Sequence, residues 1–116
     1  MQIHLSPRHL RLTAAIHQYA AAKVEELEDL GAEIIAAHIV LVHTDTAALE
    51  ARYKVKVHLA IAGPDIFAEQ KSSDLYLAID GVIAKLARQL RKRKTRLTDK
   101  RRQTSARTNE RRRAQV

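Results

Sequence analysis

The chain has 116 residues, no cysteine and a formal net charge of +8 at pH 7. This length fits one domain with a real core, and the lack of cysteine excludes disulfides and thiolate metal sites. No apolar run approaches the ~20 residues of a membrane span, and the start MQIHLSPRHL lacks the pattern of an export signal, so we expect a cytoplasmic protein.

The charge is distributed unevenly along the chain. Residues 1–84 carry seven Lys or Arg against eleven Asp or Glu, which gives −4, whereas residues 85–116 carry fourteen against two, which gives +12. A mildly acidic body with a strongly basic end indicates a polyanionic partner, either nucleic acid or an acidic membrane surface.

The first part of the chain predicts a strand, a helix and a second strand. Residues 2–6 alternate and predict a strand that ends at Pro7. Thr13 is a suitable N-cap for a helix whose apolar residues recur at helical spacing as far as Leu27, with Gly31 just after its end. Residues 38–44 predict the second strand.

The clearest strand pattern lies in residues 50–62. One face would carry Tyr53, Val55, Val57, Leu59 and Ile61, and the other Arg52, Lys54, Lys56 and His58. Residues 63–65, Gly-Pro-Asp, predict a turn, and residues 66–72 predict the returning strand of a hairpin.

The last predicted helix begins at Ser73 or Asp74. Its apolar stripe consists of Leu75, Ile79, Val82, Ile83, Leu86 and Leu90. Each residue turns a helix by about 100°, so Lys85, Arg88 and Lys92 fall on the opposite side as one ridge. The stripe has ended by Arg93, so we expect the helix to project past the sheet with its cations.

The predicted order is βαβββα, an α+β fold. Both helices are amphipathic, so we expect them on one face of a four-stranded mixed sheet, as in a double-stranded-RNA-binding domain. The first strand must pair in parallel with a neighbour, because a helix follows it. We predict a folded domain over residues 1–95 and a basic tail, residues 96–116, that is disordered when free.

The candidate site consists of cations that could contact RNA phosphates. They are Lys23, Lys54, Lys56, Lys85, Arg88, Arg91, Lys92 and Lys94. The chain has only four aromatic residues, and Tyr53 is predicted to face the core, so we expect contacts to phosphate and shape rather than base stacking.

Each group of cations also has a structural interpretation. Lys85 and Arg88 alone would be an ordinary solvated helix face. Lys54 and Lys56 would keep an exposed sheet soluble, and Lys23 would lie with its stem along the apolar arc of the first helix. Arg8 and Arg11 stay undecided in the same way.

The sequence favours neither a metal site nor catalysis. The six histidines have no ligand-like spacing, and His38 and His43 would face opposite ways on a strand. Asp65 fits a turn, Asp74 a helix start and Asp80 the first turns of a helix, where its charge suits the dipole. We therefore predict no metal, no cofactor and no enzymatic activity.

The stretch DLYLAIDGVIAKLARQLRKRK, residues 74–94, resembles the signature of the bacterial ribosome hibernation-promoting factors, also called ribosome-associated inhibitors. The opening MQIHLS, the segments LTAAI, AAK and LE of the first helix, and the strand–Gly–strand hairpin are similar to the same family. The resemblance spans residues 1 to about 97 and implies the βαβββα fold.

The resemblance implies a protein that binds the small ribosomal subunit and its rRNA between head and body. There it would occupy the channel of messenger and transfer RNA and stop translation in stress or stationary phase. The family's rRNA-facing basic positions correspond to Lys23, Lys85, Arg88, Lys92 and Lys94. His17 and Glu26 stand where some relatives have a basic residue.

The resemblance also implies pairing of ribosomes into inactive dimers. Long family members have a separate C-terminal dimerisation domain that this sequence lacks, so we expect pairing to need a second factor and the free protein to be monomeric. Another short subgroup of the family ends in an acidic tail, so the resemblance implies no role for this basic tail, and our hypothesis is that it extends the rRNA contact along the channel.

Two alternatives stay open at this point. One is a general double-stranded-RNA or nucleic-acid binding module that acts through its basic helix and tail. The other is a general nucleic-acid or membrane-surface binder that uses the tail alone, although we expect no membrane partner. An ordered ridge of helix cations would favour the ribosomal function, because a tail-only binder does not need one.

Overall fold

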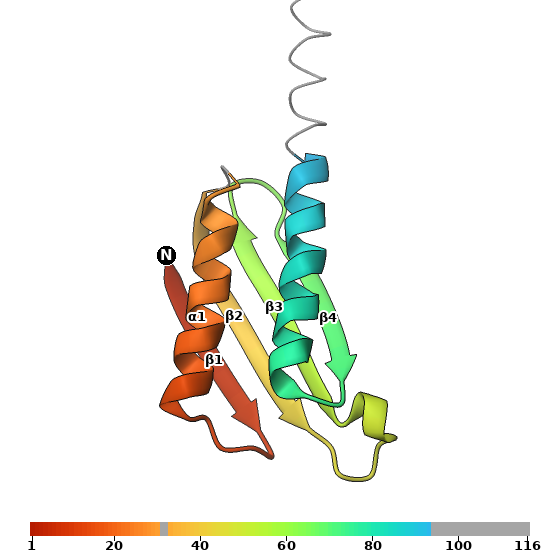
Figure 1. Cartoon of the computed structure of the whole chain (residues 1–116). Helices are drawn as coiled ribbons and strands as arrows, with labels where there is room; N and C mark the ends of the chain where they lie inside the picture. Colours follow the sequence, from red (N-terminus) through yellow and green to blue (C-terminus); the bar gives the residue numbers. More distant parts are fainter. Residues whose placement is uncertain (31–32, 94–116) are drawn as a thin grey trace, which may run out of the picture.

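The computed structural model describes residues 1–30 and 33–93. It confirms the predicted βαβββα order (Figure 1). The elements are β1 (Gln2–Arg8), α1 (Ala14–Glu28), β2 (Ile34–His43), the short 3-10 helix η1 (Leu49–Ala51), β3 (Tyr53–Ile61), β4 (Ile66–Ser72) and a final helix that is described over residues 75–93.

The four strands form one mixed sheet in the order β1-β2-β3-β4. β1 pairs with β2 in parallel, as expected for a strand that a helix follows, and the other two pairs are antiparallel. β1 and β4 are therefore the two edge strands. Their free edges need cover or charge, because an unpaired edge invites strand addition.

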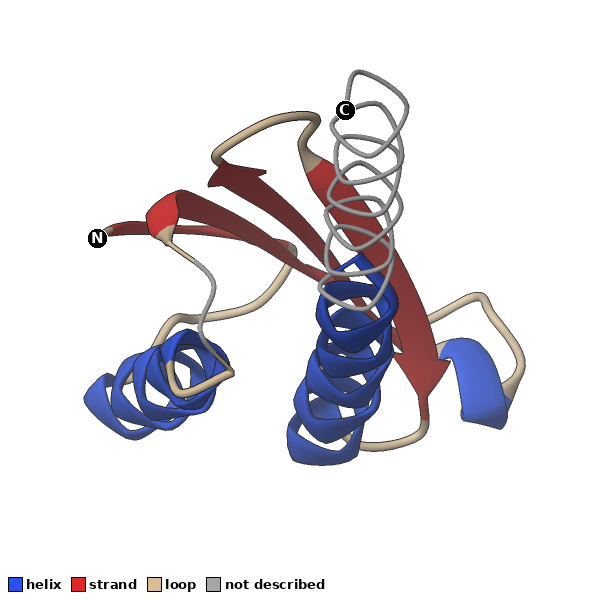
Figure 2. Cartoon of the chain, turned by 90° about the horizontal axis from the view of Figure 1, so that it is seen from above, coloured by secondary structure: helices blue, strands red, loops and turns tan. Residues whose placement is uncertain are grey.

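Both helices pack on one face of the sheet, as predicted (Figure 2). α1 covers β1 and β2, and the final helix covers β3 and β4 (Figure 1). The core is aliphatic, and no polar or charged side chain is buried in the described part of the chain. Its largest fully buried side chains are Leu27, Leu41, Leu59, Ile79, Leu86, Val24, Val55, Val57 and Val82.

Side-chain caps begin both helices. The Thr13 hydroxyl accepts a hydrogen bond from the backbone N–H of Ile16 at 3.2 Å, as predicted. The Asp74 carboxylate accepts from the backbone N–H groups of Tyr76 and Leu77 at 2.8 and 3.1 Å, so Asp74 rather than Ser73 is the cap. Each cap satisfies donors that the first helical turn leaves without a partner.

The strand bounds differ from the predicted ones for local reasons. β2 begins at Ile34 rather than at residue 38, because its first residues pair with the far end of β3 across a β-bulge. β1 continues through Pro7, which an edge strand tolerates. β3 begins only at Tyr53, because η1 precedes it and the carbonyl of Arg52 accepts from the N–H of Thr44 at 2.8 Å.

Gly81 lets the final helix approach β4 closely. A Cβ at this position would lie 2.6 Å from Cγ of Gln70, which is shorter than any tolerated contact. At the opposite end of β4, Gly63 has φ +90° in the predicted turn, a conformation that favours glycine. The close approach of the helix to β4 thus depends on Gly81, and the conformation of the turn before β4 on Gly63.

We expect Asp74→Ala to lower the free energy of unfolding by about 1 kcal/mol, because two N–H groups lose their acceptor. Urea denaturation followed by circular dichroism measures this change. Asp74→Ser is the matched control, since a hydroxyl also caps. Equal stability of the two variants would contradict the capping role.

Candidate nucleic-acid interface

One side of the final helix covers the free edge of β4. Lys85, Gln89 and Arg93 follow one another at intervals of four residues and therefore share one helix side, which we call the edge row. Their side chains donate to the backbone carbonyls of Glu69, Phe67 and Pro64 at 2.7, 2.8 and 2.5 Å respectively. The edge row thus satisfies two carbonyls of β4 that no fifth strand pairs, and a third in the turn that precedes β4.

The edge row changes the predicted role of two cations. Lys85 is exposed, as expected, but its ammonium is already bonded to β4 and does not extend the ridge of Arg88 and Lys92. Arg93 does not project, because it is half-buried against the turn that contains Gly63 and Pro64. Any projection of the helix, together with Lys94 and the basic tail, lies outside the described residues.

The outer side of the final helix carries the remaining predicted cations. Arg88 and Lys92 are exposed and one turn apart, and Arg91 between them is also exposed. On the side of the same helix that faces the sheet, Leu86 and Leu90 are 0% and 5% exposed. We call Arg88 and Lys92 the outer pair. Their position confirms that the apolar stripe directs cations away from the core.

Lys23 lies between the two helices rather than on an open surface. Its ammonium is 3.9 Å from a carboxylate oxygen of Asp80, which also accepts a 2.5 Å hydrogen bond from the phenol of Tyr19. The same ammonium lies 5.6 Å from the centre of the Tyr19 ring, and Tyr76 packs edge-on against that ring. This cluster joins α1 to the final helix. It gives Asp80 a partner on α1, which the sequence did not indicate.

The hydrogen bond to Asp80 perturbs Tyr19. The Asp80 carboxylate accepts a hydrogen bond from the phenol O–H, and this bond, helped by partial burial and the nearby negative charge, raises the pKa of Tyr19 to about 12. The raised pKa means that the contact stabilises the fold at every pH below about 10. This stabilisation is lost as the pH rises through about 12.

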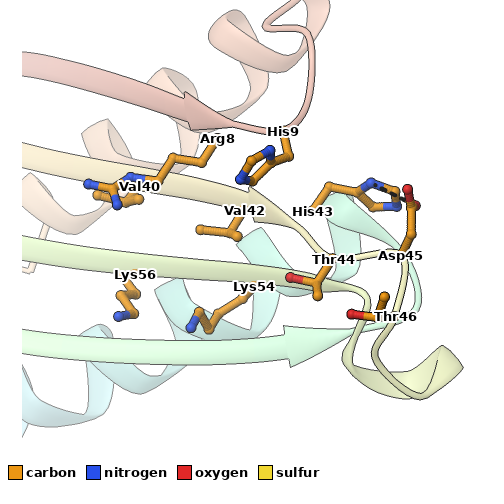
Figure 3. A pocket seen from close by; sticks show the side chains of 10 residues that line it. All are labelled: Arg8, His9, Val40, Val42, His43, Thr44, Asp45, Thr46, Lys54 and Lys56. Carbon is orange, nitrogen blue, oxygen red and sulfur yellow. Dashed lines mark ion pairs between the residues drawn. The ribbon is translucent and has the colours of Figure 1, made fainter.

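Lys54 and Lys56 line a hollow on the open face of the sheet, the face without helices (Figure 3). Arg8 of β1 extends across β2 toward Val40 in the same hollow, so three cations from two strands surround it. We call it the basic hollow. Its remaining lining is His9, Val42, His43, Thr44, Asp45 and Thr46. Arg8, undecided from the sequence, thus joins the predicted strand cations.

The open face also carries aromatic rings, which corrects the premise that it has none for base stacking. Tyr53 faces the core, as predicted. Phe67 of β4, however, is 64% exposed on the open face and stacks on His58 of β3. The alternation of residues 66–72 is the signal that could have placed Phe67 on this face. Its position beside His58 follows only from the pairing of β3 with β4.

Two negative findings apply to the described residues. Within residues 1–30 and 33–93, no three His, Cys, Asp or Glu side chains come together as a potential metal site. Neither α1 nor the final helix as far as residue 93 is long and apolar enough to cross a membrane.

Comparison with known proteins identifies relatives over most of the chain. The family model described as Sigma 54 modulation protein / S30EA ribosomal protein matches residues 3–98. The ribosome hibernation promoting factor of Escherichia coli K12 is 33% identical, over 84% of this chain and 97% of its own length. The ribosome hibernation promotion factor of Deinococcus radiodurans is 38% identical over 83% of this chain, which spans only about half (51%) of that protein.

Solved structures share the fold. The N-terminal domain of Thermus thermophilus Protein Y superposes with a TM-score of 0.68 at 24% identity, over 79% of this chain and 98% of that one. A ribosomal subunit interface protein from Coxiella burnetii superposes with a TM-score of 0.71 at 23% identity, over 82% and 99% of the two chains. At this level of identity, the likeness concerns the fold alone.

We expect Asp80→Asn to lower the pKa of Tyr19 from about 12 toward the ordinary value of 10, because an amide keeps an acceptor but removes the negative charge. An ultraviolet absorbance titration of tyrosinate measures it, with Tyr19→Phe assigning the signal among the three tyrosines. A titration in which the wild-type protein shows three ordinary tyrosines would contradict this contact.

The edge row predicts that Lys85 and Arg88 differ in how much they contribute to the free energy of unfolding. Lys85→Ala should lower the free energy of unfolding by about 1 kcal/mol, because the Glu69 carbonyl loses its donor. Arg88→Ala, on the outer side, should change it by less than about 0.5 kcal/mol. Urea denaturation of both variants tests this, and equal costs would mean that Lys85 does not hold the strand edge.

Proposed function

The chain belongs to the Sigma 54 modulation protein / S30EA ribosomal protein family, and from this premise we propose that it is a ribosome-binding hibernation factor. The names of its Escherichia coli and Deinococcus radiodurans relatives support this function. The Escherichia coli relative is matched over nearly its whole length, so it supports the function for a protein of this size.

The observation that carries the proposal is the division of the final helix into three sides. One side packs in the core, the edge row holds β4, and the outer side presents the outer pair and Arg91 at its surface. A helix held on two sides fixes the direction of the cations on the third. Fixed cations suit an RNA backbone, in which successive phosphates are regularly spaced.

The finer function follows the family. The protein would occupy the channel of the small subunit between head and body and exclude messenger and transfer RNA. Arg88, Arg91 and Lys92 would contact rRNA phosphates, with Lys85 and Lys94 adding charge beside them. Lys23, Lys54 and Lys56 would contribute from α1 and the sheet. Pairing of ribosomes would need a second factor, and the protein would act in the cytoplasm, where ribosomes are.

The test measures binding to purified small subunits as a function of salt. With six to ten phosphate contacts, affinity should fall about 10³–10⁵-fold between 50 and 200 mM salt. Replacing both members of the outer pair by Ala should weaken binding and reduce the slope of log affinity against log salt by about 1.4–1.8, because two phosphate contacts are lost.

The matched control exchanges the two side chains, Arg88→Lys with Lys92→Arg, and keeps both charges. It should retain the wild-type salt slope, and circular dichroism should be unchanged in both variants. A flat salt response would count against phosphate contact. Sedimentation of cell lysates in sucrose gradients then separates binding to subunits, whole ribosomes and dimers. If the protein bound duplex RNA of any sequence as tightly as it binds small subunits, the general RNA-binding alternative would be favoured.

A further inference from the structure

The open face of the sheet carries a row of four rings. The strand register places His4, His38, His58 and Phe67 opposite one another across β1, β2, β3 and β4. We call this the ring row. The centroids of successive rings are 5.0, 6.1 and 4.3 Å apart, and the first and last pairs are stacked. Every strand of the sheet contributes one ring.

The ring row is held in place at the Phe67 end. The His58 ring donates through Nε2 to the Asp65 carboxylate at 2.7 Å, and Asp65 lies in the turn between β3 and β4. Phe67 stacks on the ring that this bond orients, with 26° between the two planes. Phe67 belongs to an edge strand and remains 64% exposed, so much of its ring is available for a further contact.

A hollow lies beside the ring row, and we call it the ring hollow. His38, His58 and Phe67 line one side of it, while Lys56 and Glu69 of the next row line the other. The remaining lining is the side chain of Val40 and the backbone of Val57 and Ala68, whose side chains face the core. Rings on one side and a donor and an acceptor on the other suit a flat, polar heterocycle.

The ring hollow adjoins the basic hollow. Val40 and Lys56 line both. Lys54 lies two residues from Lys56 on the same strand face, about 6.6–6.8 Å further along the sheet. Arg8, Lys54 and Lys71 stand in this next row of the register. Rings and cations therefore adjoin each other at a spacing suited to a base and its neighbouring phosphate.

We propose that the open face of the sheet binds a single-stranded RNA segment, with an unpaired base in the ring hollow and the adjoining phosphates in the basic hollow. The base stacks on the exposed ring of Phe67, as bases do on exposed rings of RNA-binding sheets. The Glu69 carboxylate accepts from the exocyclic amine of the base, which favours cytosine over uracil.

The charges of this face favour RNA over a second copy of the chain. A symmetric contact between two open faces would bring two sets of four cations, Arg8, Lys54, Lys56 and Lys71, into one interface, where Glu69 of each copy compensates only part of the charge. Such like-charge contact is unfavourable, whereas phosphates neutralise it. This surface lies on the face of the sheet opposite the two helices (Figure 2). It deepens the proposed function, on which it rests, by adding an unpaired base to the phosphate contacts of Lys54 and Lys56.

Binding of fluorescently labelled RNA decamers to the whole protein tests the proposal. Wild-type protein should bind oligocytidylate about 5- to 150-fold more tightly than a phosphodiester decamer without bases, which is the effect of one base–ring stack. Phe67→Leu, which keeps apolar bulk but removes the ring, should abolish this difference. Phe67→Tyr, which keeps the ring, should retain it.

Controls separate an effect of the ring row on RNA binding from effects of misfolding, of the helix surface and of self-association. Leu77→Ala removes an equally exposed apolar side chain, 59% exposed, from the helix layer and should leave the base preference unchanged. The outer-pair variant should also keep it, so failure here is distinguishable from failure of ribosome binding. Equal affinity of wild-type protein for both decamers overturns the proposal. So does a Phe67→Leu variant that alters only sedimentation of the free protein, since a second copy would then occupy the face.

Discussion

The packing of the final helix against β3 and β4 is the constraint on which the rest of the structure depends. The apolar stripe from Leu75 to Leu90 fixes the rotation of this helix about its own axis. Once that rotation is set, residues at intervals of four toward β4 become the edge row, and Arg88 and Lys92 must face solvent. The close approach at Gly81 fixes the distance as well. One apolar contact thereby determines which cations hold the fold and which remain available.

Local periodicity was sufficient to predict the element order, the side on which the helices pack and the direction of the outer pair. It could not separate Lys85 from that pair. In a helix considered alone, the side toward β4 and the outer side both carry polar residues and look alike. Only the position of β4 beside the helix gives Lys85 and Gln89 carbonyl acceptors. The bond between Tyr19 and Asp80 was equally hidden, since it joins residues 61 positions apart.

The surface of the sheet shows the same limit for strands. Alternation predicts the face of each side chain, but the partner across the sheet depends on register, which is a property of two strands together. His4 meets His38 because β1 pairs with β2 in parallel, and Phe67 meets His58 because of the length of the turn before β4. Four ordinary residues in four separate strands therefore become one row only after folding.

The two faces of the molecule offer different kinds of contact to RNA. The outer side of the final helix presents charges that neutralise phosphates and carry little sequence information, whereas the ring row presents flat surfaces that require unpaired bases. A rigid core between them means that binding at one face does not deform the other, so their free energies add for well-separated sites. When one face is bound to a large RNA assembly, the second face meets a high effective concentration of nearby strands. If both proposed surfaces bind RNA, together they would hold the protein more tightly on an assembly that offers structured and unpaired RNA than either surface would hold it on free RNA.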